Sequence, residues 1–379
     1  MEQNKITCFC CHGDETELDA LIAVGNDNYI CDACSDQIHE LFALRKQHQK
    51  SVNRKKSPMY PKQIKHQLDE TVIGQEAAKK VLSVEIFNHY KRINNPDLQV
   101  QKSNILMIGD SGTGKTLLVQ TLAKMLDLPF VIADMSLVTA SGYVGQDVES
   151  FLQQLVIAAD NDIAKAQHGI VMLDEVDKIA KRNLTSSAEK DPSGEGVQQC
   201  LLKILEGSKV KLNVDGIKSK DSYIDTSNIL FICAGAFFGL DKVIEKNHSS
   251  DTTSIGFSAD INKSDFQNIP INEHDIIEYG FIPEFVGRLP VMVQLQKLTR
   301  NDYRRILTEP KNCIINQYVE LMKIDNIKLE FSEQFFDEVI DEVEKTRRGA
   351  RALRSIIENK LREIIYEIDE NNEGQTIHL

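Results

Sequence analysis

The stretch Asn104–Thr116, NILMIGDSGTGKT, decides the fold of this chain. Its final part, GDSGTGKT, matches the pattern G-x-x-x-x-G-K-[ST] at every fixed position. The apolar run before Gly109 predicts a buried strand, and TLLVQTLAKML after the glycines predicts a helix. A strand, a glycine-rich loop and a helix in this order are the context in which the pattern marks a phosphate-binding loop and not an ordinary glycine-rich turn. The sequence therefore predicts an α/β domain of the P-loop NTPase type.

Each residue type in the loop has a chemical role toward a nucleoside triphosphate. Gly112 and Gly114 let the backbone curl so that successive N–H groups point at a phosphate, and the following helix adds its positive N-terminal end. Lys115 can reach the β- and γ-phosphates, and Thr116 can offer its hydroxyl to Mg²⁺. The predicted nucleotide-binding residues of the loop are Asp110, Ser111, Gly112, Thr113, Gly114, Lys115, Thr116 and Leu117.

A second signature follows further along the chain, in GIVMLDEVDK, 169–178. The apolar strand predicted there ends in two carboxylates. Asp174 would hold Mg²⁺ through its water shell, and Glu175 would orient or deprotonate the attacking water. Many strands end in acidic residues, but one that follows a phosphate-binding loop at this separation strongly favours a nucleotide hydrolase.

The cysteines are unevenly placed, with five of the eight in the first 34 residues. Two C-x2-C pairs form the pattern C-x2-C-x19-C-x2-C, which is typical of a structural zinc site with four thiolates. A segment this short cannot fold on an apolar core, so the metal would supply the folding energy. Free reduced thiols are the alternative, and Cys10 and His12 leave the choice of ligands open. The expected Zn²⁺ ligands are Cys8, Cys11, Cys31 and Cys34.

The overall composition is that of a globular protein, with 41% apolar and 27% charged residues. The formal net charge of −13 argues against a general nucleic-acid binder. The sequence has no apolar run long enough to span a bilayer, and its N-terminus has no basic-then-apolar signal peptide. We therefore expect a cytoplasmic protein with no membrane partner and no specific nucleic-acid partner.

The chain length indicates two or three domains. We expect a zinc-binding domain over residues 1–45 and a basic, polar, proline-bearing linker over 46–61. A large α/β ATPase domain would then cover 62–295, and a small, mainly helical lid domain 296–379. The last predicted helix, in 348–368, places on one face the apolar residues Leu353, Ile356, Ile357, Leu361, Ile364 and Ile365.

Taken together, these motifs resemble those of an AAA+ ATPase. Two arginines complete the pattern, one in the turn FIPEFVGRLP, 281–290, and one in GARALRS, 349–355. With the cysteine pairs and the segments GYVGQDVE, SGEGVQQ and SIGF, nearly the whole chain closely resembles the ClpX family of AAA+ unfoldases. The resemblance implies a homo-hexameric ATPase that uses ATP and Mg²⁺, unfolds and translocates protein substrates, binds adaptors and feeds the ClpP peptidase. It implies no intrinsic peptidase activity.

The resemblance also implies roles for single residues around the nucleotide. Val72 and Ile73 would line the adenine pocket. Arg288 would act as an arginine finger that reaches the γ-phosphate bound by a neighbouring subunit. Arg351 would be the lid arginine that senses nucleotide within its own subunit. The expected catalytic set is Lys115, Asp174, Glu175, Arg288 and Arg351.

Two segments place bulky apolar side chains in conspicuous positions. An aromatic and a β-branched residue lie between two glycines in GYVG, 142–145, and two apolar residues flank a glycine within the long polar stretch Asp241–Glu278. The residues alone leave open whether these side chains pack on their own domain. By the resemblance, the first segment would be the pore loop that grips substrate and the second the loop that docks on ClpP. The candidate residues are Tyr143 and Val144, and Ile255, Gly256 and Phe257.

A nucleic-acid motor or clamp loader is the alternative function, because AAA+ folds do both kinds of work. The acidic charge balance and the GYVG segment favour the unfoldase. An aromatic-aliphatic pair can grip any polypeptide, whereas a DNA motor usually shows basic pore loops. A self-contained protease is a third interpretation, but no H-E-x-x-H occurs and no length is left for a protease domain. We therefore expect proteolysis to need a partner.

Overall fold

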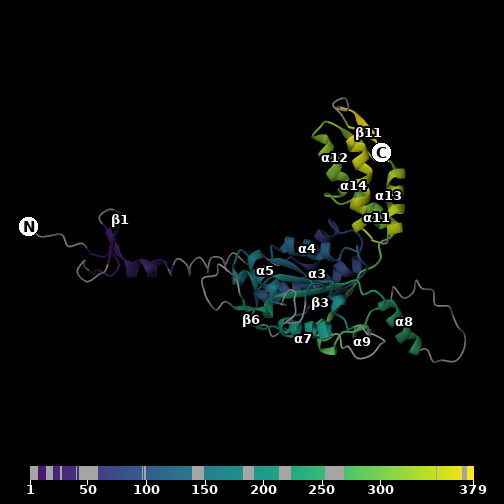
Figure 1. The fold of residues 1–379 in the computed structure, drawn as a ribbon. Coiled ribbons are helices and arrows are strands. Elements are labelled where there is room, and N and C mark those ends of the chain that lie inside the picture. Colours follow the sequence, from purple (N-terminus) through teal and green to yellow (C-terminus); the bar gives the residue numbers. More distant parts are fainter. Residues whose placement is uncertain are drawn as a thin grey trace, which may run out of the picture. The chain divides into compact units, whose positions relative to one another are not determined.

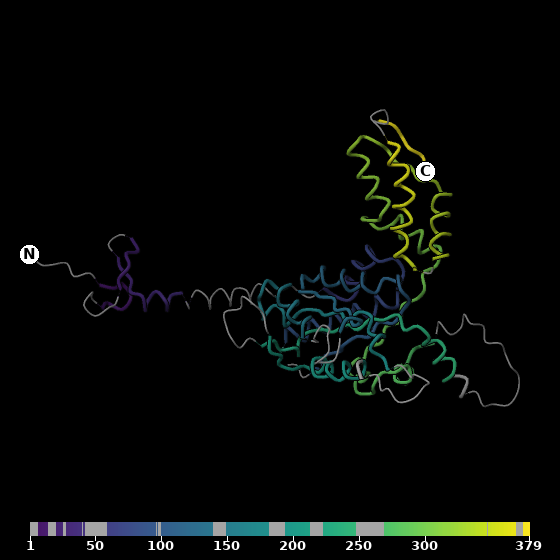
Figure 2. Tube along the Cα trace, in the orientation of Figure 1, coloured from purple at the N-terminus to yellow at the C-terminus, as the bar shows by residue number. Residues whose placement is uncertain are grey.

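Figure 1 shows the computed structural model of the chain, and Figure 2 gives its Cα trace in the same orientation. The chain divides into two compact units, Met1–Pro58 and Met59–Leu379, which we describe separately. The structure describes residues 7–13, 20–25, 28–39, 41, 59–95, 97, 100–138, 149–181, 192–212, 223–251, 269–346, 348–368 and 374–379.

The first unit is built around a hairpin. Strands β1, Leu21–Gly25, and β2, Asn28–Cys31, pair antiparallel, and a helical segment, 32–39, follows directly. Within the described residues, its interior consists of buried thiols with two partly buried aliphatic side chains against them, namely Cys8, Cys31 and Cys34 with Leu21 and Ile30. A unit of this size is too small to fold on an apolar core alone. An interior made largely of sulfur is consistent with folding around a metal ion.

In the described part of the second unit, five strands form a parallel sheet in the order β4-β5-β8-β3-β9. Parallel strands are covered by helices on both faces, which explains why the predicted strand before the P-loop is apolar and buried at every position. The strands are β3 Ile105–Ile108, β4 Phe130–Asp134, β5 Ile170–Asp174, β8 Leu230–Gly235 and β9 Val291–Gln294.

The alternation of side chains along these strands builds one core on each face of the sheet. Leu106 of β3 and Leu173 of β5 belong to one core, whereas Met107 and Met172 belong to the other. The first core packs against α5, Ser150–Ala158, and α7, Pro192–Glu206. The second packs against α2 Pro61–Asp69, α3 Glu76–Asn94 and α4 Lys115–Leu126.

The stretch Asp241–Glu278, predicted only as a long polar segment, begins and ends in helices. These are α8, Leu240–Asp251, and α9, Glu273–Tyr279, and each inserts a buried isoleucine, Ile244 and Ile276, into the first core. A few apolar residues in polar surroundings are therefore enough to anchor both helices to this core. The remaining elements of the α/β part are α6 Ile163–Ala166, η1 Val176–Ile179, β6 Lys209–Lys211, β7 Tyr223–Asp225, η2 Thr226–Asn228 and α10 Pro283–Val286.

The C-terminal region of the second unit has a core of its own. Its helix α14 buries Leu353, Ile357 and Leu361, as the helical spacing predicts, while Ile364 and Ile365 are only partly buried. Its strands β10 and β11 pair in parallel. The elements are α11 Arg300–Thr308, α12 Ile314–Lys323, β10 Lys328–Glu330, α13 Glu333–Thr346, α14 Arg351–Tyr366 and β11 Thr376–His378.

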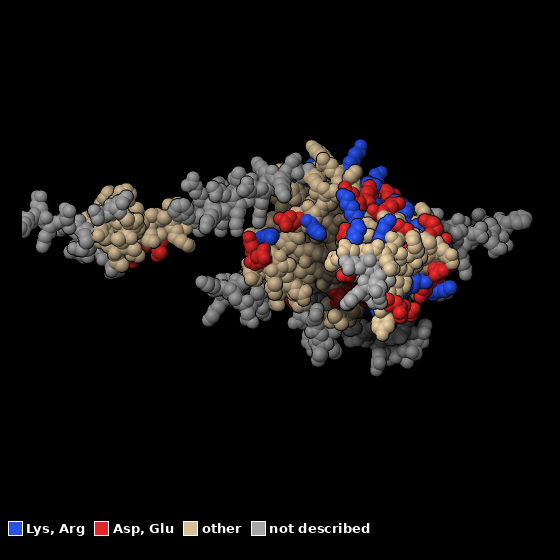
Figure 3. Space-filling view, turned by 90° about the horizontal axis from the view of Figure 1, so that it is seen from above, with Lys and Arg blue, Asp and Glu red and all other residues tan. Residues whose placement is uncertain are grey.

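The surface of this region carries charges of both signs, as Figure 3 shows. Arg300 of α11 pairs with Asp341 and Glu344 of α13 at 2.6 and 2.7 Å, and Arg304 pairs with Asp337 at 2.8 Å. Exposed pairs of this kind contribute little each, so the apolar interior carries most of the stability. None of the helices in the described ranges has the length and apolar character that a membrane span requires.

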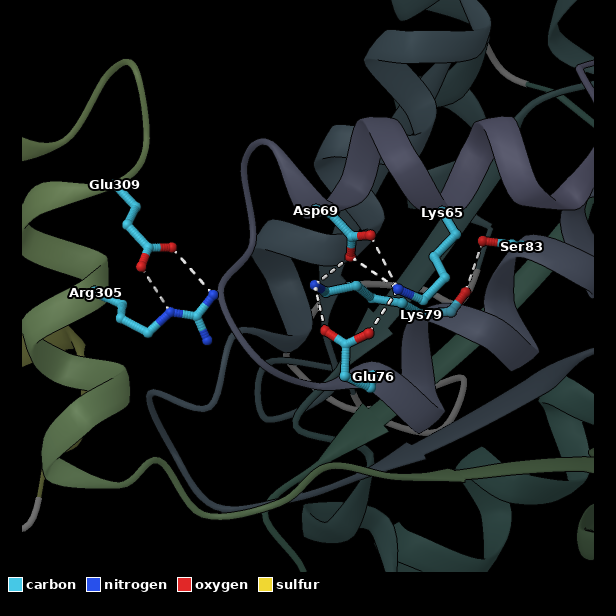
Figure 4. Close-up of polar contacts among 7 residues, drawn as sticks. All are labelled: Lys65, Asp69, Glu76, Lys79, Ser83, Arg305 and Glu309. Carbon is cyan, nitrogen blue, oxygen red and sulfur yellow. Dashed lines mark hydrogen bonds and ion pairs between the residues drawn. The ribbon is translucent and has the colours of Figure 1, made fainter.

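A cluster of four charges ties α2 to α3 (Figure 4). The side chain of Lys79 is only 2% exposed, and its Nζ lies 2.6 Å from Asp69 Oδ1 and 3.3 Å from Glu76 Oε1. Lys65 contacts the same carboxylates, at 2.9 Å from Asp69 and 2.6 Å from Glu76. The hydrogen bond from Lys65 lowers the pKa of Glu76 below its usual range. The cluster thereby fixes both ends of the loop 70–75.

We expect Lys79→Ala to lower the free energy of unfolding of the second unit by about 1–3 kcal/mol, because two carboxylates would then share Lys65 alone. The effect stays below that of a fully buried pair because Asp69 and Glu76 are 40% and 67% exposed. Thermal unfolding measures it. Lys80→Ala is the matched control, since that side chain is exposed. Equal melting temperatures for the two variants would contradict the role of the cluster.

Candidate functional site

The loop between β3 and α4 requires glycine at two positions. Gly112 and Gly114 have φ values of 78° and 100°, in the left-handed region that favours glycine. A Cβ at Gly112 would also lie 2.4 Å from the carbonyl oxygen of Arg348. The loop therefore curls tightly into the N-terminus of α4, where free N–H groups and the helix dipole favour an anion.

Lys115 points back into this loop. Lys115 is only 9% exposed, and its Nζ donates to the carbonyl oxygens of Gly109 at 2.5 Å and Asp110 at 3.0 Å. Burial lowers the pKa of Lys115, and the carboxylate of Asp174 opposes this shift. The ammonium thus lies inside the loop that a triphosphate would occupy. Phosphate oxygens are stronger partners for it than the neutral carbonyls that hold it here.

The carboxyl ends of β3 and β5 bring Thr116 and Asp174 together. Thr116 Oγ1 donates to Asp174 Oδ2 at 3.3 Å, although the two residues are 58 positions apart. A hydroxyl and a carboxylate side by side are the hard oxygen ligands that Mg²⁺ prefers. Glu175 is exposed beyond the strand end, with its N–H donating to Asp174 Oδ1 at 2.9 Å. Its φ of 55° is unusual for a residue with a side chain, and such backbone conformations cluster at functional sites.

The start of α14 lies against the P-loop. The N–H of Ala350 donates to the carbonyl oxygen of Gly112 at 3.2 Å, and a Cβ at Gly349 would lie 2.7 Å from that of Ser111. Arg351 begins the helix, and its charge is near enough to Lys115 to contribute to the lowered pKa of that lysine. The structure therefore places Arg351 beside the phosphate loop of its own chain.

A cavity of about 390 Å³ lies between the P-loop helix and the C-terminal helices. Its volume is within the range of small-molecule sites. Among the residues that line it, Leu117 belongs to the predicted set, while the others were missed because no local pattern marks them. They include Thr71, Ile306, Cys313, Ala350 and Leu353.

Val72 and Ile73, predicted for the adenine pocket, lie in the loop between α2 and α3. Both are buried, at 3% and 6% exposure. Val72 Cγ1 would be 3.9 Å from a Cβ at Gly114, so the loop passes beside the phosphate-binding glycines. The neighbouring Glu70 and Thr71 contribute to the lining of the cavity.

Arg288 lies just beyond α10 and contacts an acidic side chain of its own chain. Its guanidinium forms an ion pair with Glu206 at the end of α7, with each side chain about half exposed. The carbonyl oxygen of Arg288 accepts a hydrogen bond from Asn104 Nδ2 at 3.0 Å, which fixes the turn next to the start of β3. The structure therefore holds the turn rigidly and leaves the arginine side chain at the surface.

The four paired cysteines form one cluster. The Sγ atoms of Cys8, Cys11, Cys31 and Cys34 all lie within 4.8 Å of one another. Hydrogen bonding from the backbone of Cys11 lowers the pKa of Cys8 to about 6, whereas the hydrogen bond with Cys31 raises that of Cys34. A thiolate in such a cluster repels a second thiolate and so disfavours its ionisation. A bound dication compensates for this repulsion. The donor set and its compactness fit tetrahedral Zn²⁺.

Comparison with known proteins identifies the family. An AAA domain (Cdc48 subfamily) model matches residues 100–292, and the C-terminal, D2-small domain, of ClpB protein matches 298–378. The ATP-dependent Clp protease ATP-binding subunit ClpX of Bacteroides thetaiotaomicron is 43% identical, over 97% of this chain and 92% of the relative. The chain belongs to the ClpX family of AAA ATPases. ClpX proteins of Bacteroides fragilis and Treponema denticola are each 41% identical and cover 99% and 96% of the chain, and 94% and 90% of their own lengths.

Membership of the ClpX family confirms several expectations from the sequence. The chain is an ATPase with an AAA α/β domain, a helical C-terminal region and an N-terminal cysteine cluster. Its cofactors are ATP and Mg²⁺, and the four-cysteine cluster is consistent with Zn²⁺. The alternative of a nucleic-acid motor or clamp loader is not favoured by any of these relatives.

Two of the predicted loops fall outside the described residues. They contain the pore-loop candidates Tyr143 and Val144 and the docking candidates Ile255, Gly256 and Phe257.

For the metal centre of this ClpX-family chain we expect about one Zn²⁺ per chain, as for a four-thiolate site. Cys34→Ser should lose most of the metal because it removes one of four converging ligands. Cys10→Ser is the matched control, since Cys10 is exposed and lies outside the cluster. Elemental analysis of reduced, folded protein measures both. A metal-free wild type, or equal loss in the two variants, would contradict the assignment.

Proposed function

We propose that this chain is an ATP-dependent protein unfoldase, the ATP-binding subunit of a Clp protease, and that it passes its substrates to the ClpP peptidase. The observation that carries the proposal is the similarity to the Bacteroides thetaiotaomicron ClpX over 97% of the chain. The net charge of −13 agrees with a protein substrate better than with a nucleic acid.

The residues around the P-loop divide the hydrolytic work between them. In this proposal Lys115 binds the phosphates, Thr116 and Asp174 hold the cation, and Glu175 orients and deprotonates the attacking water. The proximity of Thr116 Oγ1 and Asp174 Oδ2, at 3.3 Å, supports the shared role of that pair. Bound ATP supplies the phosphoanhydride bond whose hydrolysis drives the cycle. Arg351, beside the loop, would respond to the charge that the nucleotide brings.

Arg288 is proposed as the arginine finger between neighbouring subunits of a homo-hexamer. Its ion pair with Glu206 keeps the guanidinium at the surface, about half exposed. Exposed ion pairs of this kind are weak, so a triphosphate on an adjacent subunit would compete for the arginine. Such an exchange would make hydrolysis depend on assembly.

The parts that handle protein are proposed from the family resemblance. Tyr143 and Val144 would grip the substrate within the ring, and Ile255, Gly256 and Phe257 would dock on ClpP. An aromatic-aliphatic pair suits this work because it contacts any polypeptide without reading its sequence. The zinc unit would receive substrates and adaptors, in the cytoplasm.

Glu175→Gln tests the hydrolytic assignment. The variant should still bind ATP, while its turnover should fall by about 100-fold or more, because the amide cannot take the proton from water. Steady-state hydrolysis and equilibrium binding of ATP measure the two effects. Lys115→Ala serves as the contrast, since it should weaken binding itself. Near-normal turnover in Glu175→Gln would remove this residue from the mechanism.

Phe257→Ala tests the partner. ATP hydrolysis and unfolding of a tagged, stable protein should continue, while its degradation with added ClpP should collapse. Burial of a Phe in a pocket contributes about 1.5–3 kcal/mol, and several loops on one ring would lose it at once.

The control for this experiment is Phe238→Ala, which removes a phenylalanine that is 70% exposed and should leave degradation intact. If Phe257→Ala degrades substrate with ClpP at the normal rate, the docking role is wrong. If the unaltered protein drives no degradation with ClpP in ATP, the proposed partnership itself is wrong.

A further inference from the structure

The buried side chain of Gln75 joins three backbone segments around the nucleotide site. Gln75 precedes α3, is 5% exposed and has a φ of 58°. Its Oε1 accepts from the N–H of Gln296 at 2.9 Å, and its Nε2 donates to the carbonyl oxygen of Gln296 at 2.8 Å. The same Nε2 donates to the carbonyl oxygen of Thr113 at 3.2 Å. Every polar atom of the side chain is therefore engaged with backbone.

The three segments have different tasks. Thr113 belongs to the P-loop, two positions before Lys115. Gln296 lies just past the end of β9, where the chain leaves the sheet toward α11. Gln75 itself ends the loop 70–75, and the charged cluster of Figure 4 holds the residues that flank this loop on both sides. One side chain thus links the phosphate loop, the adenine-side loop and the linker to the C-terminal region.

The contact with Thr113 sets the direction of a phosphate-binding N–H. The carbonyl oxygen of Thr113 and the N–H of Gly114 belong to one planar, trans peptide unit, so they point in opposite directions. Because Gln75 holds the oxygen, the N–H of Gly114 points away from Gln75. In a P-loop these N–H groups are the ones that cradle phosphate. A rotation of this peptide on nucleotide binding would therefore displace the side chain of Gln75, which is hydrogen-bonded to it.

The contact with Gln296 would transmit such a displacement to the linker between β9 and α11, residues 295–299. The linker also lies on the first residue of the P-loop, since a Cβ at Gly109 would be 2.8 Å from Leu295 Cβ. The N–H of Leu295 donates to the carbonyl oxygen of Ile108 at 2.7 Å. Gln75 adds a pair of hydrogen bonds, one in each direction, that fixes the next peptide of the linker.

The amide group of glutamine meets the requirements of this position. The side chain must offer one acceptor and two donors while it remains buried and uncharged. Glutamate would place a carboxylate oxygen against two carbonyl oxygens, without protons between them. The left-handed backbone of Gln75, with a φ of 58°, is also costly, and such a conformation persists only where the surrounding contacts hold it.

We propose that Gln75 is a positioning residue that couples occupancy of the P-loop to the linker 295–299, and through it to the C-terminal helices. It does not touch the reacting atoms and acts through Thr113 and Gln296. For its mechanical consequence, the movement of the C-terminal region, the inference rests on the proposed function. The coupling itself concerns only nucleotide binding.

The test compares Gln75→Ala and Gln75→Glu with Gln296→Ala in the full chain. Gln296 is the matched control because its side chain is exposed and only its backbone meets Gln75. ADP affinity is measured by calorimetry with Mg²⁺, and amide hydrogen exchange of the linker is measured with and without ADP. We expect ADP to slow linker exchange in the wild type and in Gln296→Ala. Both Gln75 variants should lose this slowing and bind ADP about tenfold more weakly.

A separate result distinguishes coupling from stability. Gln75→Ala should melt within a few degrees of the control, and in both Gln75 variants saturating ADP should still slow exchange at the P-loop itself. The proposal is overturned if Gln75→Ala keeps the slowing in the linker, if the wild type shows none, or if Gln296→Ala loses it equally. These readouts need no substrate and no ClpP, so a failure of the proposed function would leave them unchanged.

Discussion

The parallel register of β3, β8 and β5 is the constraint on which the nucleotide site depends. Ile108 at the end of β3 is opposite Gly235, and Leu173 near the end of β5 is opposite Cys233. Strands that run in one direction bring their carboxyl ends to one edge, where ligands bind in open α/β sheets. This register places Thr116 within hydrogen-bonding distance of Asp174. A slip of one residue would move each buried side chain to the core on the opposite face of the sheet and separate that pair.

The first unit depends on a different kind of interaction. Its buried thiols cannot all be ionised together without a cation, as the opposite shifts of the pKa values of Cys8 and Cys34 indicate. Metal binding converts the thiols to thiolates and releases their protons. The folding of this unit is therefore coupled to the metal concentration and to pH. The two cores of the sheet in the second unit are mainly aliphatic and aromatic, with the buried thiol of Cys233 among them, and gather no such cluster of thiols within the described residues.

The parts of the molecule that could be predicted from the sequence are those with local signals. The P-loop, the acidic strand end and the cysteine pairs are short segments in which spacing fixes geometry, and the buried face of α14 follows from helical periodicity. The contacts of Gln75 with Gln296 and of Arg288 with Glu206 join residues 221 and 82 positions apart. No local pattern encodes such pairs, because they arise only when separate elements pack. The helices α8 and α9 were missed because their polar faces outweigh their few buried residues.

The C-terminal region keeps its own core, and this determines how it can move. Leu307, Val339 and Leu361 belong to a cluster separate from both cores of the sheet. The contacts described between the P-loop and the segments beyond the sheet include a hydrogen bond from Ala350 and an exposed ion pair between Lys297 and Asp110 at 3.4 Å. Such contacts contribute little compared with the burial of an apolar side chain. A rotation of the C-terminal region would therefore break and re-form weak polar contacts while the apolar cores stay intact. A domain that moves during a cycle of nucleotide binding and release must meet this condition.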